Sequence, residues 1–271
     1  MNAPAVSIIL PAYNCEKFIG KAIESVLLQS FPDFELIIIN DGSTDKTEMI
    51  ILGYADPRIV YLKNPENKGL IFTLNRGIAL AHGKYIARMD ADDICQPERF
   101  EKQKNFLDQH INIAVLATTI DFINEAGIKT GVWESDRQTI TPQQIKRKII
   151  FENCIAHPTV MMRAELIKDL KYSRNQKNIE DYDLWLRVLN RGLIIAKLDE
   201  PLLLYRLHED SVTSQHLKNR NPFFKHLMMK SRFLRNILWT NSFNWFTFKI
   251  SMSRLIDLVK GIAKTIKNIF S

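Results

Sequence analysis

Three carboxylates stand within four residues where an apolar segment ends. Residues 85–89 have the composition of a buried strand, and Asp90, Asp92 and Asp93 follow it directly. In open parallel sheets, ligands bind where such strands end. Carboxylates this close repel one another, and a hard cation such as Mn²⁺ or Mg²⁺ relieves that repulsion through oxygen ligands. The pattern therefore predicts a metal site, with an acidic turn before the helix that begins near Pro97 as the alternative.

Acidic residues also gather at the start of a later helical pattern. Apolar residues recur at helical spacing over residues 179–191, Gly192 is placed to end the helix, and Glu180, Asp181 and Asp183 fall in its first turn. Negative side chains complement the helix dipole there, so a structural role explains them as well as catalysis does. The spacing alone leaves both interpretations open.

The elements that would position these residues alternate along the first half of the chain. Helical patterns separate four apolar strand segments, at residues 6–10, 36–39, 59–62 and 84–89. Such alternation predicts right-handed crossovers and an α/β fold with a mostly parallel, doubly wound, Rossmann-like sheet. The carboxyl ends of the strands then share one rim, where these sheets hold nucleotides, formed by residues 11–14, 40–43, 64–69 and 90–93.

From Ala114 onward the pattern loosens to an α+β type. Thr141 and Gln144 form a capping box that opens a basic helix. Three further segments are strand-like, at residues 115–118, 129–133 and 157–163.

Composition sets the class of protein and its compartment. The 271 residues are 46% hydrophobic and 25% charged, which is typical of a globular protein. Three widely spaced cysteines, Cys15, Cys95 and Cys154, argue against a disulfide framework or a zinc site and favour a reducing cytoplasm. The chain has no signal-peptide pattern and no uncharged apolar stretch of 18 residues, so we expect neither export nor a membrane span.

Taken together, five motifs resemble the family 2 glycosyltransferases with the type A fold, over about residues 5–210. They are S-I-I-L-P-A-Y-N (7–14), E-L-I-I-I-N-D-G-S-T-D (35–45), N-K-G with N-R-G (67–69 and 75–77), D-A-D-D (90–93) and E-D-Y-D-L-W-L-R (180–187). The resemblance implies inverting transfer of a sugar from a nucleoside diphosphate sugar. It also implies a catalytic domain over residues 1–215, with a nucleotide-binding half (1–113) and an acceptor-side half (114–215).

The resemblance further assigns roles to single residues. It implies metal binding by Asp92, possible metal contact by His208, and general-base catalysis by Asp181, which would take the proton of the acceptor hydroxyl. It places the nucleotide sugar against a set of rim residues, namely Pro11, Tyr13, Asn14, Asp41, Gly69, Asp90 and Asp93.

Two of these roles have a chemical rationale. A carboxylate at Asp41 that accepts the imide N–H of uracil discriminates against cytosine, which favours a uridine donor. The ring of Tyr13 would stack on the base, or would instead anchor its loop on the first helix. A single histidine such as His208 is as often a residue at the start of a helix or in the core. The Q-x-x-R-W pattern of processive relatives is absent, so we expect transfer of one sugar per encounter.

The pattern of the C-terminal segment, residues 216–271, predicts a basic amphipathic helical tail. Residues 218–271 hold 11 Lys and Arg but a single acid, Asp257. On a helical wheel Leu255, Val259, Ile262, Ile266, Ile269 and Phe270 share one side, and Lys249, Asp257, Lys260, Lys264 and Lys267 share the other. The tail suits an anionic membrane surface. Packing on the catalytic domain or on a second copy in an oligomer is the alternative, and nucleic acid binding is a poorer explanation because no motif accompanies the charge.

The sequence therefore predicts a metal-dependent, non-processive hexosyltransferase that is peripheral on the inner, cytoplasmic face of the cell membrane. We expect a UDP-hexose or UDP-N-acetylhexosamine donor and a glycan or lipid-linked acceptor, in lipopolysaccharide or capsule synthesis. A sugar-nucleotide nucleotidyltransferase uses a similar sheet, but its Gly-rich basic loop is missing from residues 10–15. A non-catalytic membrane- or glycan-binding protein with the same fold is the other alternative.

Overall fold

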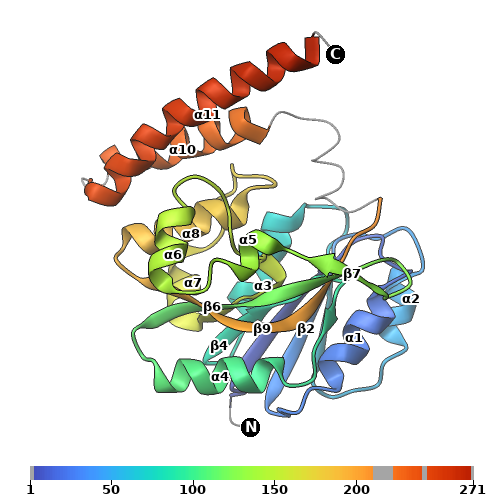
Figure 1. Cartoon of the computed structure of the whole chain (residues 1–271). Coiled ribbons are helices and arrows are strands. Elements are labelled where there is room, and N and C mark those ends of the chain that lie inside the picture. The colour runs from blue at the N-terminus through green and yellow to red at the C-terminus, as the bar shows by residue number, and fades with distance from the viewer. Residues whose placement is uncertain (1–2, 210–221, 240–242, 270–271) are drawn as a thin grey trace.

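The first four strands in the order of the sheet are apolar and pair in parallel. The computed structural model describes residues 3–209, 222–239 and 243–269 (Figure 1). The strands run in the order β3-β2-β1-β4. Their bounds are β1 (Val6–Ala12), β2 (Phe34–Asn40), β3 (Ile59–Lys63) and β4 (Tyr85–Arg88). Crossover helices join them in sequence, α1 (Ile19–Leu27), α2 (Thr47–Leu52) and α3 (Leu70–Leu80). Because the strands are parallel, their carboxyl ends meet at one edge, as predicted.

The second half of the chain extends the same sheet with mixed pairing. β8 (Met161–Arg163) runs antiparallel between β4 and β6 (Ile113–Ile123), and β6 pairs in parallel with β9 (Ile194–Arg206). β5 (Ile94–Cys95) and β7 (Lys129–Val132) add antiparallel pairs to β9 and β6. The α/β class is confirmed, and the mixed pairings lie in the half whose pattern predicted α+β.

One predicted strand is partly wrong. Residues 157–163 were expected to be extended, but His157–Thr159 form a 3₁₀ turn and only Met161–Arg163 pair with the sheet. Pro158 has no N–H for a sheet ladder, and its fixed φ suits the start of a helical turn.

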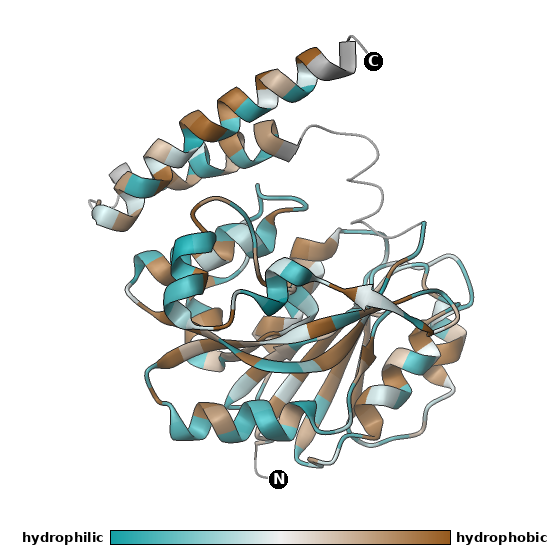
Figure 2. Cartoon of the chain, viewed as in Figure 1, coloured by the Kyte–Doolittle hydropathy of each residue, from teal (hydrophilic) through white to brown (hydrophobic). Residues whose placement is uncertain are grey.

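Strand alternation divides the core between the two faces of the sheet. Val6, Ile8 and Leu10 of β1 pack with α1 and α4 (Arg99–Gln109), whereas Ile9 packs with α3 and with α7 (Ala164–Leu170) and α8 (Glu180–Asn190). Two short helices complete the second half of the chain, α5 (Glu134–Arg137) and α6 (Pro142–Lys148), and the capping box of Thr141 and Gln144 is present on α6. Figure 2 shows apolar residues concentrated in the strands and both classes alternating along the helices.

The C-terminal helical appendage is confirmed as two helices that lie side by side, α10 (Pro222–Trp239) and α11 (Trp245–Ile269) (Figure 1). Met229 and Phe233 of α10 and Ile250 of α11 are buried in the same apolar cluster as α8. One side of the pair therefore packs on the part of the protein that contains α8. The expectations for residues 216–221, 240–242 and 270–271 lie outside the described residues.

The predicted amphipathic helix forms, but its polar side does not all face solvent. Phe246, Ile250, Ser253 and Asp257 follow helical spacing and are buried. Asp257 forms an ion pair with Lys230 of α10 at 2.7 Å, and both side chains are almost completely buried. The apolar row of the wheel is exposed instead, at Leu255, Val259, Ile262 and Ile266. In the described part of the chain, no helix combines the length and hydropathy that a bilayer span requires.

Candidate active site

The loops after β1 and β2 are tied together at the rim. The amide N–H of Asn14 donates to Ser43 Oγ at 3.0 Å, and Asn14 Oδ1 accepts from the N–H of Thr44 at 2.8 Å. Asn14 has a φ of 46°, a left-handed conformation that Asn tolerates better than most residues. These bonds fix the loop of Tyr13, whose side chain is 47% exposed rather than packed away. Pro11 lies half-buried in β1 beside Ile39.

Asp41 holds the loop that follows β3. Its buried carboxylate accepts hydrogen bonds from Asn64 Nδ2 at 2.6 Å and from the backbone N–H groups of Lys68 and Gly69 at 2.9 and 2.8 Å. Gly69 has a φ of 87°, which explains the need for glycine where α3 begins. This structural role was not foreseen from the sequence, and the contact of Asp41 with a base remains a prediction.

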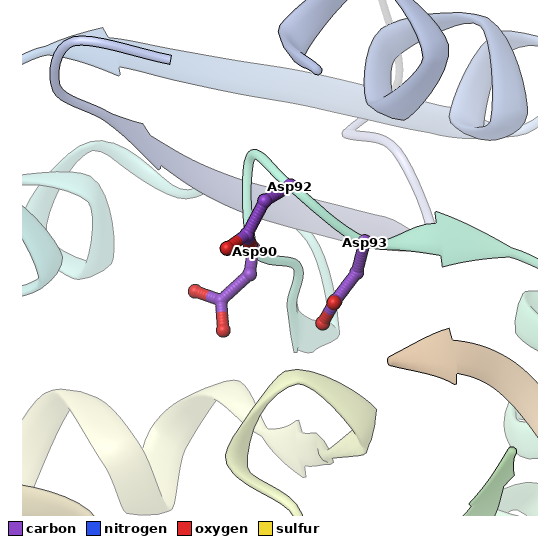
Figure 3. A group of neighbouring side chains, drawn as sticks. All are labelled: Asp90, Asp92 and Asp93. Atoms are coloured by element: carbon purple, nitrogen blue, oxygen red, sulfur yellow. The ribbon is translucent and has the colours of Figure 1, made fainter. Parts of the chain in front are cut away.

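The three carboxylates after β4 converge as the sequence predicts (Figure 3). One oxygen atom from each of Asp90, Asp92 and Asp93 lies within 4.8 Å of the others. The groups have different partners. Asp90 pairs through both oxygens with the buried guanidinium of Arg88, and Asp92 Oδ2 lies 2.9 Å from Nε2 of His208. Arg88, the last residue of β4, therefore forms an ion pair with the aspartate two residues after it.

Burial and mutual repulsion make the cluster electrostatically costly. Burial, followed by the charges of Asp92 and Asp90, raises the pKa of Asp93 well above its usual value. Asp93 Oδ1 accepts the N–H of Arg206 at 2.8 Å, but its buried Oδ2 has no hydrogen-bond partner among the described residues. An orphaned carboxylate oxygen beside Asp92 fits a hard divalent cation, so Asp92 and Asp93 are the residues that would hold Mn²⁺ or Mg²⁺.

Arg206, the last residue of β9, contacts the turn that carries the three aspartates. Arg206 Nε donates to the carbonyl of Asp92 at 2.7 Å, and its Nη1 donates to the carbonyls of Asn124 and Glu125. The guanidinium lies over the ring of Phe18, 4.8 Å from the centroid. Arg206 therefore fixes the turn that carries the acids. The sequence predicted neither these hydrogen bonds of Arg206 nor the contact with Phe18, because both depend on contacts between remote parts of the chain.

Asp181 lies in the first turn of α8. Its Oδ2 accepts from Asn153 Nδ2 at 2.7 Å, and its Oδ1 accepts from the N–H of Tyr182 at 2.7 Å. Burial raises the pKa of Asp181, and the charge of Asp181 in turn contributes to the raised pKa of Asp90, which burial dominates. The two acids therefore share one electrostatic environment. Asn153 belongs to no motif, and the sequence gave no signal for it.

The other acids of this helical turn differ from Asp181. Asp183 is buried and accepts hydrogen bonds from Ser173 Oγ, Arg187 Nε and Gln176 Nε2 at 2.8, 2.8 and 3.2 Å. Its role is therefore structural. Burial, then the charge of Asp181, raises the pKa of Glu180 to about 7.

Comparison with known proteins identifies the class and the family. The fold resembles that of Staphylococcus aureus TarS, a structure of its residues 1–349, with a TM-score of 0.72, 23% identity, and coverage of 93% of this chain and 71% of that one. The fold class is therefore the type A glycosyltransferase fold. The sequence model described as "Glycosyl transferase family 2" matches residues 7–170. The chain belongs to glycosyl transferase family 2.

Two curated relatives indicate the biological setting. Escherichia coli WbnJ, an O-antigen biosynthesis glycosyltransferase, is 34% identical over 216 residues, which cover 78% of this chain and 83% of the relative. Escherichia coli WfaP, a UDP-Glc:alpha-D-GlcNAc-diphosphoundecaprenol beta-1,3-glucosyltransferase, is 32% identical over 233 residues, covering 86% of each chain. The chain thus has homologues in bacterial surface-glycan synthesis.

Proposed function

We propose that this enzyme transfers one hexose or N-acetylhexosamine, with inversion, from a UDP-sugar to a lipid-linked glycan acceptor in surface-polysaccharide synthesis. The observation that carries the proposal is the placement of Asp181, a half-buried and oriented carboxylate that shares the electrostatic environment of Asp90 in a family 2 glycosyltransferase. A relative whose name specifies a UDP-sugar donor and a diphosphoundecaprenol-linked acceptor supports the choice of substrates.

Different residues of the rim bind different parts of the UDP-sugar. Tyr13 offers an exposed ring for stacking on uracil, and Asp41, held beside Gly69, faces the polar edge of the base. Asp90 contacts the ribose or the donor sugar, and Asp92 and Asp93 would hold the divalent cation, with His208 beside Asp92. When bound, that cation would stabilise the negative charge of the departing diphosphate.

Asp181 acts on the acceptor. Its ionised carboxylate accepts the proton of the attacking hydroxyl, and the hydrogen bond from Asn153 fixes its orientation. Because burial raises its pKa, Asp181 binds a proton more tightly than an exposed aspartate does and is the stronger base. The loop 173–176 and Asp183 hold the first turn of α8 in place.

A donor panel tests the proposal. Purified enzyme is incubated with UDP-glucose, UDP-galactose and their N-acetyl forms, with or without Mn²⁺ or Mg²⁺, and UDP release is measured. We expect slow metal-dependent release from one donor, which accelerates with a sugar–diphosphate–lipid acceptor. Release of pyrophosphate from UTP and a sugar phosphate would instead indicate a nucleotidyltransferase, and the absence of any turnover would indicate a binding protein.

We also propose that α11 lies on the cytoplasmic face of an anionic membrane. Its row of Leu255, Val259, Ile262 and Ile266 is 47–66% exposed, and a soluble monomer rarely exposes so continuous an apolar surface. The tail carries 11 basic residues, and those that face solvent, unlike the buried Lys230, contribute about 1 kcal/mol each near an anionic surface. The charge complementarity favours a membrane over a second copy of the chain.

Vesicle co-sedimentation tests this orientation. Changing the four row residues to Gln should abolish sedimentation with phosphatidylglycerol vesicles, whereas Ile111→Gln, an exposed apolar position outside the tail, should not. Sedimentation of the Gln variant at the wild-type level, or its conversion from dimer to monomer, would assign the row to a protein interface.

A further inference from the structure

An open basic cavity lies at the surface between α10 and the loop that leads into α8, and its three arginines are exposed. Its volume is about 410 Å³, and the residues that line it are all polar. Arg174 comes from the loop, and Arg232 and Arg235 come from α10. No acidic residue lines the cavity. We refer to it as the arginine cavity.

The three arginines lack the acidic partners that several other arginines of this protein have. Across the part of the chain that the structure describes, none of them forms an ion pair, whereas Arg58, Arg88, Arg187 and Arg191 each do. Arg232 Nη1 donates to the carbonyl of Asn175 at 2.5 Å, and this hydrogen bond fixes the position of the Arg232 side chain in the cavity wall. Arg232 and Arg235 are neighbours on the helix surface, where like charges repel. A bound anion would relieve that repulsion.

Contacts connect the walls of the arginine cavity to the first turn of α8 and to α11. Its Gln176 is bonded to Asp183, two residues beyond Asp181, and Lys225 of α10 donates to the carbonyl of Asn178 at 3.3 Å. α10 is thus attached to the loop that precedes the catalytic turn. On its other side α10 packs against α11, which presents the exposed apolar row.

The structure assigns the arginine cavity as the binding site for the diphosphate of the lipid-linked acceptor. Guanidinium groups bind phosphate oxygens in a bidentate manner and keep their charge, which suits a diphosphate better than a neutral glycan. In this arrangement the lipid follows the exposed row of α11, the diphosphate enters the cavity, and the sugar reaches Asp181. The inference rests on the proposed function, because it names the part of the acceptor that this enzyme recognises.

A binding measurement without turnover tests the cavity first. Pyrophosphate is titrated into the full chain by calorimetry, with EDTA present to remove metal-mediated binding at the aspartate cluster. The variant Arg174→Gln/Arg235→Gln should bind at least about tenfold more weakly, the loss expected when two charge-assisted contacts disappear. The control Lys21→Gln/Arg147→Gln removes the same charge from exposed positions outside the cavity and should bind normally. Equal binding by all three proteins would overturn the assignment.

A kinetic comparison then identifies the source of the phosphate. The same sugar is offered on a short isoprenyl diphosphate and as an uncharged alkyl glycoside. The Arg174→Gln/Arg235→Gln variant should show a KM at least about tenfold higher for the diphosphate acceptor only, with kcat and donor hydrolysis unchanged. An equal change with both acceptors, or a change in sedimentation with phosphatidylglycerol vesicles and not in KM, would overturn the acceptor assignment. A wild-type protein that binds pyrophosphate but releases no UDP from any donor would instead contradict the proposed function.

Discussion

Breaking the buried ion pair between α10 and α11 should lower the free energy of unfolding of the protein. In Asp257→Ala, Lys230 loses its 2.7 Å partner and keeps a long hydrogen bond to the carbonyl of Phe151, at 3.4 Å, and a contact with the ring of Tyr182, 6.0 Å from its centroid. The Lys230 side chain is fully buried, so solvent does not screen the loss. Removing one member of such a pair costs about 3 to 5 kcal/mol. Deprotonating a lysine of ordinary pKa 10.5 at pH 7 costs about 4.8 kcal/mol, which sets an upper limit.

The pH dependence gives this prediction a second readout. Burial already lowers the pKa of Lys230, and Asp257 opposes that shift. Without Asp257 the pKa in the folded protein falls further below 10.5, so the unfolded chain binds more protons than the folded one between the two values. The variant should therefore regain stability as the pH rises from 7 toward 10.

Urea unfolding followed by circular dichroism measures these free energies. Asp169→Ala, which breaks an exposed pair with Arg191, is the matched control and should leave the unfolding free energy almost unchanged. The double variant Lys230→Met/Asp257→Leu should recover most of the loss, because apolar residues of similar volume can replace a buried pair. An Asp257→Ala protein as stable as the wild type at pH 7, with no gain at higher pH, would refute the reasoning.

Three shorter predictions concern the rim. Gly42→Ala should cost about 2 to 4 kcal/mol in urea unfolding, because Gly42 has a φ of 72° and a Cβ there would lie 2.5 Å from the backbone carbon of Glu66; unchanged stability would contradict the geometry. Asp92→Asn should abolish the Mn²⁺-dependent part of UDP binding in calorimetry while leaving the fold intact, and undiminished metal dependence would remove Asp92 from the ligand set. Because burial raises the pKa of Asp181, kcat should fall on the acid side at a higher pH than an exposed aspartate would give, and a flat profile down to pH 4 would exclude it as the base.

The residues of the rim could be predicted because they follow a local rule. Strands with continuous apolar runs are parallel and buried, and the polar residues directly after them must meet at one edge. Asp41 and Asp90 were placed at that edge by this rule alone. The cap at Thr141 and the end of α8 at Gly192 likewise depend on neighbouring residues.

The remaining features depend on contacts between distant segments. Asn153, which orients Asp181, lies in a loop with no periodic pattern, and Arg206 reaches the aspartate turn only because β9 pairs beside β5. Asp257 shares a side of the helical wheel with lysines, yet a partner helix turns it into the interior. A wheel records spacing within one helix and carries no information about which neighbour covers each side.

The Asp181→Asn variant provides the most direct test of the central claim. UDP-sugar affinity is measured by calorimetry and transfer by UDP release with a lipid-linked acceptor, in parallel with wild type. We predict an unchanged donor affinity and a transfer rate at least about 10²-fold lower, since the amide keeps the size of the side chain but cannot accept the proton. A transfer rate within a few-fold of wild type would contradict the account and return Asp181 to a structural role at the start of α8.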